Sequence, residues 1–196
     1  MWQPLISQDN GQICLAYVLV LAWDNCLILF KELVNSLSPT QLDQTLAVLE
    51  TAHSICGPWR SAIRSDALYA MINIALTQFA DPFLQVFRVF AGALFEGQSI
   101  GDAETQGHIS LRLLQLYYDL TAQDLPPIFE DSLADFFAPT TGWFPRYLQW
   151  TSPDPKLHGE PDDIAPSLIS QIKTTVLEIA EVGGTCGCFW DLLTCF

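Results

Sequence analysis

Basic residues are scarce in this sequence. Its 196 residues include 8 Lys and Arg against 22 Asp and Glu, which gives a formal net charge of −14. Proteins bind nucleic acid and anionic lipid largely through cationic side chains, so this composition argues against both as partners. The excess of acids either attracts a basic protein partner or simply keeps soluble a chain in which 50% of the residues are hydrophobic.

Sequence motifs of catalysis are also missing. The chain contains no glycine-rich dinucleotide loop, no P-loop, no nucleophile elbow and no H-E-x-x-H motif. Its three histidines, His53, His108 and His158, share no regular spacing. His53 falls on the apolar side of a predicted helix, where a hydrogen-bonded core histidine is expected rather than a general base. We therefore predict no enzyme activity and no catalytic, cofactor-binding or metal-binding residue.

Cysteines are few and mostly scattered, with no C-x-x-C pair. The six are Cys14, Cys26, Cys56, Cys186, Cys188 and Cys195. The last three form the only cluster, and a metal site there is the minor alternative, because no histidine stands at zinc-ligand spacing. The pattern favours reduced thiols in a cytosolic or nuclear protein.

Long hydrophobic runs are limited to ICLAYVLVLAW, residues 13–23, which Asp24 and Asn25 interrupt before CLILF resumes. A helix that spans a bilayer needs about 20 apolar residues. No basic residue precedes the run, so a signal peptide would lack its charged start. A buried helix is the first interpretation, and a membrane anchor over residues 13–30 is the alternative.

Helical periodicity accounts for most of the chain, and almost no segment alternates like a strand. The stretch TQLDQTLAVLETAHSIC predicts a helix capped by Thr40, and SDALYAMINIALTQFA predicts a second helix capped by Ser65. Asp81-Pro82 then either kinks this second helix or begins a new one. The residues expected to face the core are Leu42, Leu46, Leu49, His53 and Cys56 in the first helix, and Leu68, Ile72, Ala75, Leu76 and Phe79 in the second.

The stretch YYDLTAQDLPPIFEDSLADFF, residues 117–137, predicts a corner between two helices. Asp124 is the expected cap of the second helix, whose first turn holds Pro126 and Pro127, where proline costs little. Its adjacent acids at 130–131, like those at 162–163, are expected to be solvated rather than to bind a cation. The expected core residues are Ile109, Leu113, Leu116, Tyr117 and Leu120 before the corner, and Ile128, Phe129, Leu133, Phe136 and Phe137 after it.

Proline interrupts the next part of the chain, with six between residues 139 and 166. Residues 151–165 predict an exposed loop without regular structure. PSLISQIKTTVLEIAEVG predicts a final helix over 167–182, capped by Ser167 and stopped by two glycines. This helix is expected to bury Leu168, Ile172, Val176 and Ile179, and an earlier stripe of Trp143, Phe144, Tyr147 and Trp150 is expected to pack into a neighbouring helix.

Three predicted helices close helical pairs, and they end near residues 57, 122 and 183. Their separations of about 65 and about 61 residues exceed a HEAT unit of about 40–47 residues, which a long linker explains. The pattern predicts an all-α protein, an α-solenoid of HEAT-like antiparallel hairpins, with a single all-α bundle as the alternative. Arg60 and Arg64 are expected to pair with Asp66 or to meet an acidic partner.

Three segments carry a resemblance to a known family. They are VLETAHSICGPWRSAIRSDALYAMINIALTQFADPFLQVF, LQLYYDLTAQDLPPIFEDSLADFF and PSLISQIKTTVLEIAE. They resemble the CAS-type nuclear export receptors, the importin-α re-exporters of the importin-β (karyopherin) superfamily, and the similarity runs over residues 30–183. The resemblance implies a superhelix of HEAT repeats without catalytic activity. It also implies Ran-GTP and importin-α as partners, and location in the nucleus, the cytoplasm and the nuclear envelope.

The resemblance also implies a division of the chain. Residues 1–29 are expected to form an atypical apolar helix, residues 30–184 the HEAT-like repeats, and residues 185–196 a ragged tail. Receptors of this family are several times longer, so a truncated product of the N-terminal arch is expected, or a free-standing acidic scaffold. Phe189, Trp190, Leu192, Leu193 and Phe196 predict an apolar patch and self-association through the exposed solenoid ends. No contact residue for Ran or importin-α is assigned.

Overall fold

The computed structural model describes residues 37–38, 40–97, 100–159 and 165–183, and in these ranges the regular structure is entirely helical. The predicted apolar helix of residues 1–29, the cysteine cluster and the apolar patch of the tail lie outside the described residues. None of the described helices combines the length and the hydropathy that crossing a membrane requires.

The first described helix is α2, Leu42–Ser61, and its cap position falls one residue later than predicted. Gln41 stands at the cap position instead of Thr40, whose hydroxyl is 2.9 Å from that of Ser38. The lead-in is fixed by Thr45, whose hydroxyl donates to the Ser38 carbonyl at 2.6 Å. The start of α2 is therefore fixed by Thr45, which lies inside the helix. Thr40, the predicted cap, contacts Ser38 in the preceding turn instead.

Helix α3, Asp66–Phe95, is 30 residues long and begins as predicted. The Ser65 hydroxyl accepts from the Leu68 amide at 3.2 Å. Of the two alternatives for Asp81-Pro82, the structure has one continuous helix with Pro82 inside it. All the residues predicted to face the core from the first half of this helix are buried.

Helix α4, Ala103–Thr121, is followed by two short helices, α5, Pro127–Glu130, and α6, Leu133–Phe137. The predicted cap at Asp124 is wrong, because Pro126 precedes α5. The carboxylate of Asp124 accepts from the neighbouring Leu125 amide at 3.1 Å instead. The single predicted helix is divided, and Leu133 is 37% exposed rather than buried.

The remaining helices are α7, Trp143–Gln149, the 3₁₀ turn η1, Pro155–Leu157, and α8, Leu168–Gly183. The prediction of a structureless exposed loop over 151–165 is wrong at η1, where Leu157 is only 1% exposed. Asp154 orders this turn by accepting from the Lys156 amide at 3.0 Å. The four predicted core positions of α8 are all buried.

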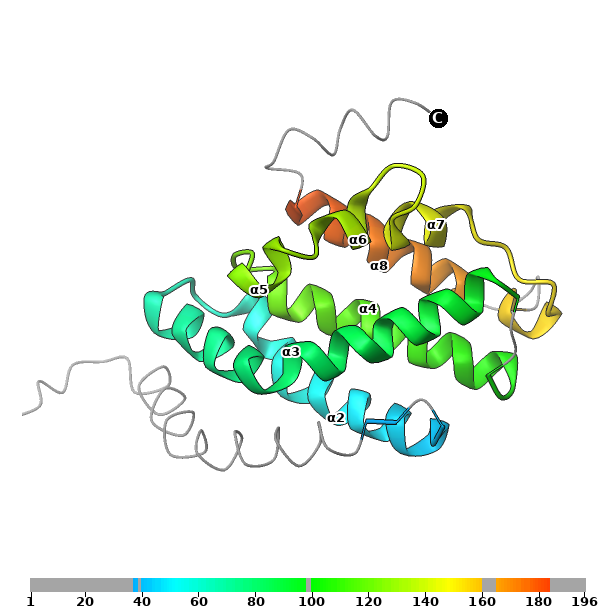
Figure 1. Ribbon diagram of the computed structural model, residues 1–196, viewed down its shortest axis with the longest axis horizontal. Helices are drawn as coiled ribbons and strands as arrows, with labels where there is room; N and C mark the ends of the chain where they lie inside the picture. Colours follow the sequence, from blue (N-terminus) through cyan, green and yellow to red (C-terminus); the bar gives the residue numbers. More distant parts are fainter. Residues whose placement is uncertain (1–36, 39, 98–99, 160–164, 184–196) are drawn as a thin grey trace, which may run out of the picture.

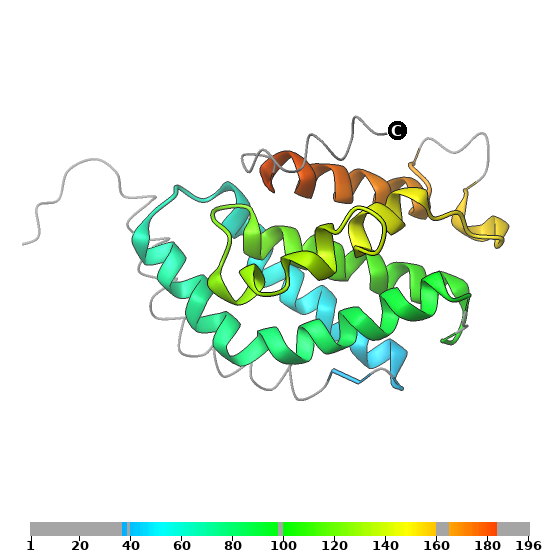
Figure 2. The same ribbon diagram turned by 45° about the horizontal axis from the view of Figure 1, so that its top comes forward.

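The helices form two layers (Figures 1 and 2). Helices α2, α4 and α8 run side by side in the same direction, and α3 runs the opposite way. The middle of α2 lies beside the middle of α4, where Glu50 meets Arg112, and the later part of α2 lies beside the later part of α4, where Gly57 faces Asp119. The start of α8 likewise touches the start of α4, where Leu168 lies against Gly107. Parallel stacking of every second helix is the arrangement of a solenoid of antiparallel pairs.

Aromatic side chains fill the space between the layers. Phe87 of α3 stacks on Trp143 of α7 with their centroids 4.7 Å apart. Tyr117 of α4 lies 4.4 Å from Phe136 and 5.2 Å from Phe144, again between ring centroids. The stripe predicted to pack into a neighbouring helix does so. These contacts place α4 in the middle of the molecule.

Replacing Tyr117 with Phe should stabilise the protein. The Tyr117 hydroxyl is buried and finds no hydrogen-bond partner among the described residues, and burial raises the pKa of this phenol. Removing an unsatisfied buried hydroxyl should raise the free energy of unfolding by about 1 kcal/mol. Urea denaturation measures the change, with Tyr118→Phe on the half-buried side of the same helix as the control. A loss of stability in Tyr117→Phe would contradict the structure.

Candidate functional site

Enzyme-like features are sparse in the described part of the chain. No group of three His, Cys, Asp or Glu side chains there could hold a metal ion. An open depression of about 220 Å³ lies between the turns that follow α2 and α4, with Arg64, Tyr69 and Gln123 in its lining. Cavities that bind small molecules usually measure about 300–1,000 Å³. The more distinctive polar feature is the contact between α2 and α4.

A buried carboxylate stands at this contact. The side chain of Asp119, on α4, is 0% exposed and reaches two groups of α2. Its Oδ2 lies 2.6 Å from Nδ1 of His53, and its Oδ1 lies 2.9 Å from Nε of Arg60. One carboxylate thus holds two side chains of the neighbouring helix.

The sequence of α2 explains how this constellation forms. His53, Gly57 and Arg60 follow one another at spacings of four and three, which places them on one face of a helix. Gly57 lies directly opposite the carboxylate, since a β-carbon there would be 3.9 Å from Asp119 Oδ2. A side chain there would meet His53 and Asp119 only at ordinary contact distances, so Gly57 lies between the two residues that reach the carboxylate without being crowded by it.

Burial and charge act on Asp119 in opposite directions. Burial raises the pKa of its carboxyl group above the ordinary value, while the hydrogen bond and charge of His53 and the charge of Arg60 act to lower the pKa. The net shift is upward, so removal from water outweighs the two partners. An ionised Asp119 therefore depends on both of them for compensation.

Further polar contacts fasten the ends of the two helices. The Gln123 side-chain amide donates to the carbonyls of Trp59, Arg60 and Ala62, at 2.8, 3.1 and 3.0 Å. These carbonyls lie at the end of α2, where the helix no longer supplies its regular amide partners, and the Trp59 carbonyl also accepts from the Ala62 amide at 3.3 Å. Arg64 and Asp124 add an exposed ion pair of 3.1 Å next to them.

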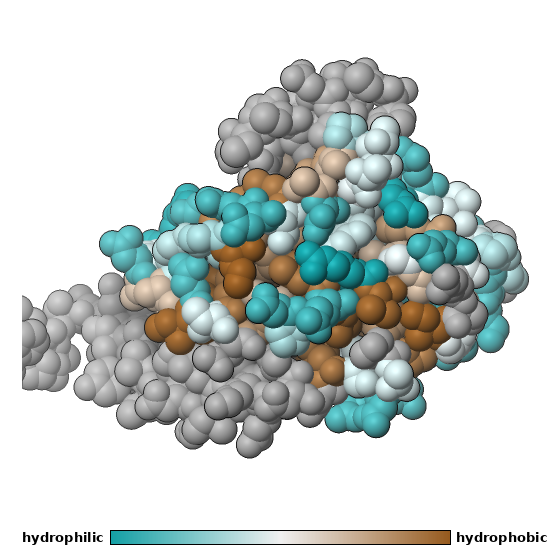
Figure 3. Space-filling model, in the orientation of Figure 1, coloured by the Kyte–Doolittle hydropathy of each residue, from teal (hydrophilic) through white to brown (hydrophobic). Residues whose placement is uncertain are grey.

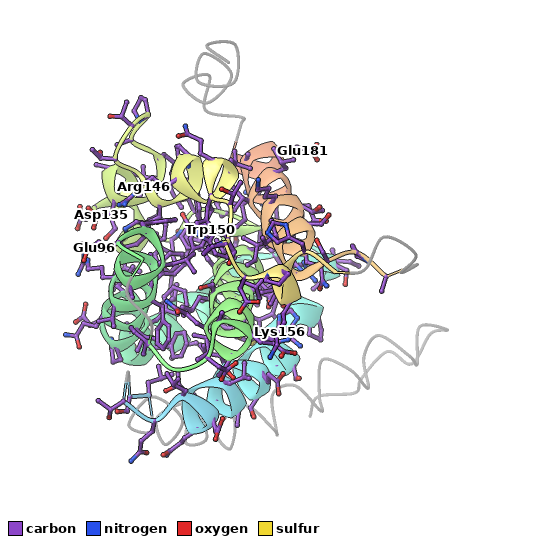
Figure 4. The ribbon with its side chains drawn as sticks, turned by 90° about the vertical axis from the view of Figure 1, so that its right-hand side faces the viewer. Glu96, Asp135, Arg146, Trp150, Lys156 and Glu181 are labelled. Atoms are coloured by element: carbon purple, nitrogen blue, oxygen red, sulfur yellow. The ribbon has the colours of Figure 1, made fainter. Side chains whose placement is uncertain are left out.

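Arginines in the outer layer are engaged in a similar way. Arg88 of α3 pairs with Asp135 of α6 at 3.0 Å, and the guanidinium of Arg146 lies 4.1 Å from the ring centroid of Phe95. Figure 4 shows Glu96, Asp135 and Arg146 gathered along one side of the molecule, whereas Glu181 projects from α8. Each described arginine contacts an acidic side chain or an aromatic ring. Many of the other described acidic residues therefore have no arginine beside them, and they make the surface negative.

Residues singled out in the sequence occupy different places. His53 is held by Asp119, His108 is exposed on α4, and His158 bonds the Ser152 carbonyl at 2.7 Å. Arg60 and Arg64 pair with α4 and the turn after it rather than with Asp66. Sequence reasoning missed Asp119 as the partner of His53 and Arg60. The available signal was an acid between Leu116 and Leu120, both on the predicted buried stripe.

Comparison with known proteins agrees with the repeat architecture. A sequence model of the Cse1 family matches residues 55–182. The "Importin-alpha re-exporter" of Schizosaccharomyces pombe is 34% identical over 163 residues, which make up 82% of this chain and 16% of that protein. The "Importin alpha re-exporter" of Saccharomyces cerevisiae is 29% identical over 156 residues, 79% of this chain and 16% of that protein.

A solved structure shares the same fold. "The exportin Cse1 in its cargo-free, cytoplasmic state" superposes with a TM-score of 0.69 and 29% identity, and the match covers 80% of this chain and 16% of that one. The fold is therefore that of a solenoid of helical repeats from an exportin. This chain belongs to the Cse1 family, and it spans about one sixth of the length of the relatives it matches.

The buried charge of Asp119 depends on its partners, so removing that charge should compensate for the loss of a partner in a double variant. Arg60→Met leaves a buried carboxylate short of one partner and should lower the free energy of unfolding by about 3 kcal/mol. Asp119→Asn removes the buried charge itself, and its two partners, 21% and 35% exposed, can still reach water. The single Asn variant should therefore cost only about 1 kcal/mol, and adding it to Arg60→Met should restore about 2 kcal/mol.

Chemical denaturation of the three variants and the wild type checks this prediction. The matched control is Asp135→Asn in the exposed pair with Arg88, which should change stability by about 0.5 kcal/mol or less. Because the folded state raises the pKa of Asp119, wild-type stability relative to Asp119→Asn should fall as pH rises through that pKa. A double variant less stable than Arg60→Met alone would refute the buried-charge explanation.

Proposed function

We propose that this chain is a protein-binding unit of a nuclear transport receptor, which takes part in returning importin-α to the cytoplasm together with Ran-GTP. The observation that supports this proposal is the family match over residues 55–182, joined by 34% identity to a protein named for importin-alpha re-export. In this role the chain binds proteins and performs no catalysis. It would be found in the nucleus and the cytoplasm and would pass through the nuclear envelope.

The character of the surface fits protein partners of basic charge. The described residues include exposed acids on both layers that have no ion pair with another described residue, among them Asp43, Asp81 and Glu178. A surface of this kind attracts basic proteins and repels nucleic acid. The proposal keeps the division into HEAT-like repeats over residues 30–184 and flanking segments at 1–29 and 185–196.

A second candidate follows from the length of the match. The chain spans 16% of the length of these relatives, and a span of this size carries only part of the surface of a whole receptor. A free-standing acidic scaffold with another basic partner, or an inactive fragment, would have the same fold.

A binding experiment separates these candidates. The purified chain is immobilised and offered importin-α with Ran loaded either with a non-hydrolysable GTP analogue or with GDP. The proposal predicts retention of both proteins only with the GTP analogue. Retention that ignores the nucleotide would favour the scaffold, and no retention in either state would overturn the transport role of this chain.

A further inference from the structure

The guanidinium of Arg60 contacts two residues of α4, but only one of its three nitrogens lies against an acceptor among the described residues. Its Nε lies against Asp119 at 2.9 Å, and its side chain is still 35% exposed. Its carbon CZ lies 4.9 Å from the ring centroid of Tyr118, the residue next to Asp119. The two terminal nitrogens of Arg60 make no hydrogen bond with any other described residue, so donors remain available on the solvent side.

The surroundings of Arg60 restrict its motion before any partner arrives. The buried carboxylate forms an ion pair with Nε at 2.9 Å, although Oδ1 accepts no hydrogen bond with good geometry, and an aromatic ring lies against the planar group. An arginine normally loses considerable rotamer freedom when it is immobilised in a contact. Here that loss has largely occurred on folding, which makes Arg60 a preorganised donor.

Two residues of α4 near this contact are of types common in protein interfaces. Tyr118 lies against Arg60. Arg112, one to two turns earlier on α4, is 30% exposed, pairs with Glu50 at 3.5 Å, and donates from Nη1 to Gln115 at 2.6 Å. Arginine and tyrosine are among the residues that contribute most to binding between proteins. We call Arg60, Arg112 and Tyr118 the α2–α4 strip.

The chemistry of the free donors determines what they bind. Guanidinium nitrogens only donate, and they match the two oxygens of a carboxylate or a phosphate. The net charge of −14 opposes a polyanion such as nucleic acid. A single carboxylate on an otherwise basic protein surface meets no such barrier, because the surrounding basic residues complement the acidic surface.

We propose that Arg60, positioned by Asp119 and Tyr118, binds the carboxylate of an Asp or Glu side chain on the protein partner. This inference rests on the proposed function, since it names how the α2–α4 strip recognises that partner. Asp119 acts as a positioning residue, because it contacts Arg60 and not the partner.

The test compares affinities of the full chain for importin-α with Ran loaded with the non-hydrolysable GTP analogue, by biolayer interferometry. Arg60→Lys keeps the charge and loses the planar fork, and it should weaken binding about tenfold. Arg88→Lys, at an ion pair of the outer layer, is the matched control and should stay within about twofold. Unfolding midpoints of both variants verify that they are folded.

Asp119→Asn separates positioning from simple charge. Without its anchor, Arg60 should bind the partner several-fold more weakly, although the variant removes a negative charge next to it. If Arg60 contributed only charge, the same variant would bind more tightly. Equal or tighter binding by Asp119→Asn, or unchanged binding by Arg60→Lys, overturns the inference while leaving the proposed function intact. Absence of binding by the wild type overturns both.

Discussion

Burial of α4 holds the described part of this protein together. Its apolar residues contact α2 on one side, α8 on another and the aromatic outer layer on a third, so that Leu113 and Leu116 are fully buried. The neighbouring helices lie mainly on α4, and hydrophobic burial of this one helix therefore orders their positions. A helix surrounded in this way can accommodate a charge only where a neighbour compensates it, which explains the place of Asp119. Figure 3 shows the face seen in Figure 1 as a surface, on which hydrophobic residues lie in small areas among hydrophilic ones.

Local sequence patterns correctly predicted those features that depend on interactions between residues close together in the chain. The start of α3 at Ser65 follows from side-chain capping, and the buried stripes of α4 and α8 follow from a 3.6-residue period. Helical periodicity favoured the solenoid over a single bundle, and the family resemblance pointed to the same solenoid. The predictions failed where tertiary contacts decide. Leu157 stands among prolines and polar residues, yet it is buried because Gly107 of α4 leaves space for it. No property of residues 151–165 alone contains that information.

The candidate site shows the same limit more sharply. An acid on a buried stripe can be recognised in the sequence, but its partners cannot. His53 precedes Asp119 by 66 residues, and the two meet only because α2 and α4 stack in the same direction. The spacing of His53, Gly57 and Arg60 places them on one face of α2, and the stacking of the two helices turns that face toward Asp119. Residues that join one repeat to the next are therefore identified by the register between helices, which short motifs do not encode.

Parallel stacking of α2, α4 and α8 has an electrostatic consequence. In a bundle of antiparallel neighbours, the dipoles of adjacent helices largely cancel, whereas in this layer they point the same way. One edge of the layer thus gathers the positive ends and the other gathers the negative ends. Asp43, Asp102 and Glu104 lie at the positive edge, and Arg60 lies in the last turn of α2 at the negative edge. Each helix added in the same direction extends both edges of this layer, while helices of the outer layer that run as α3 does offset part of its dipole.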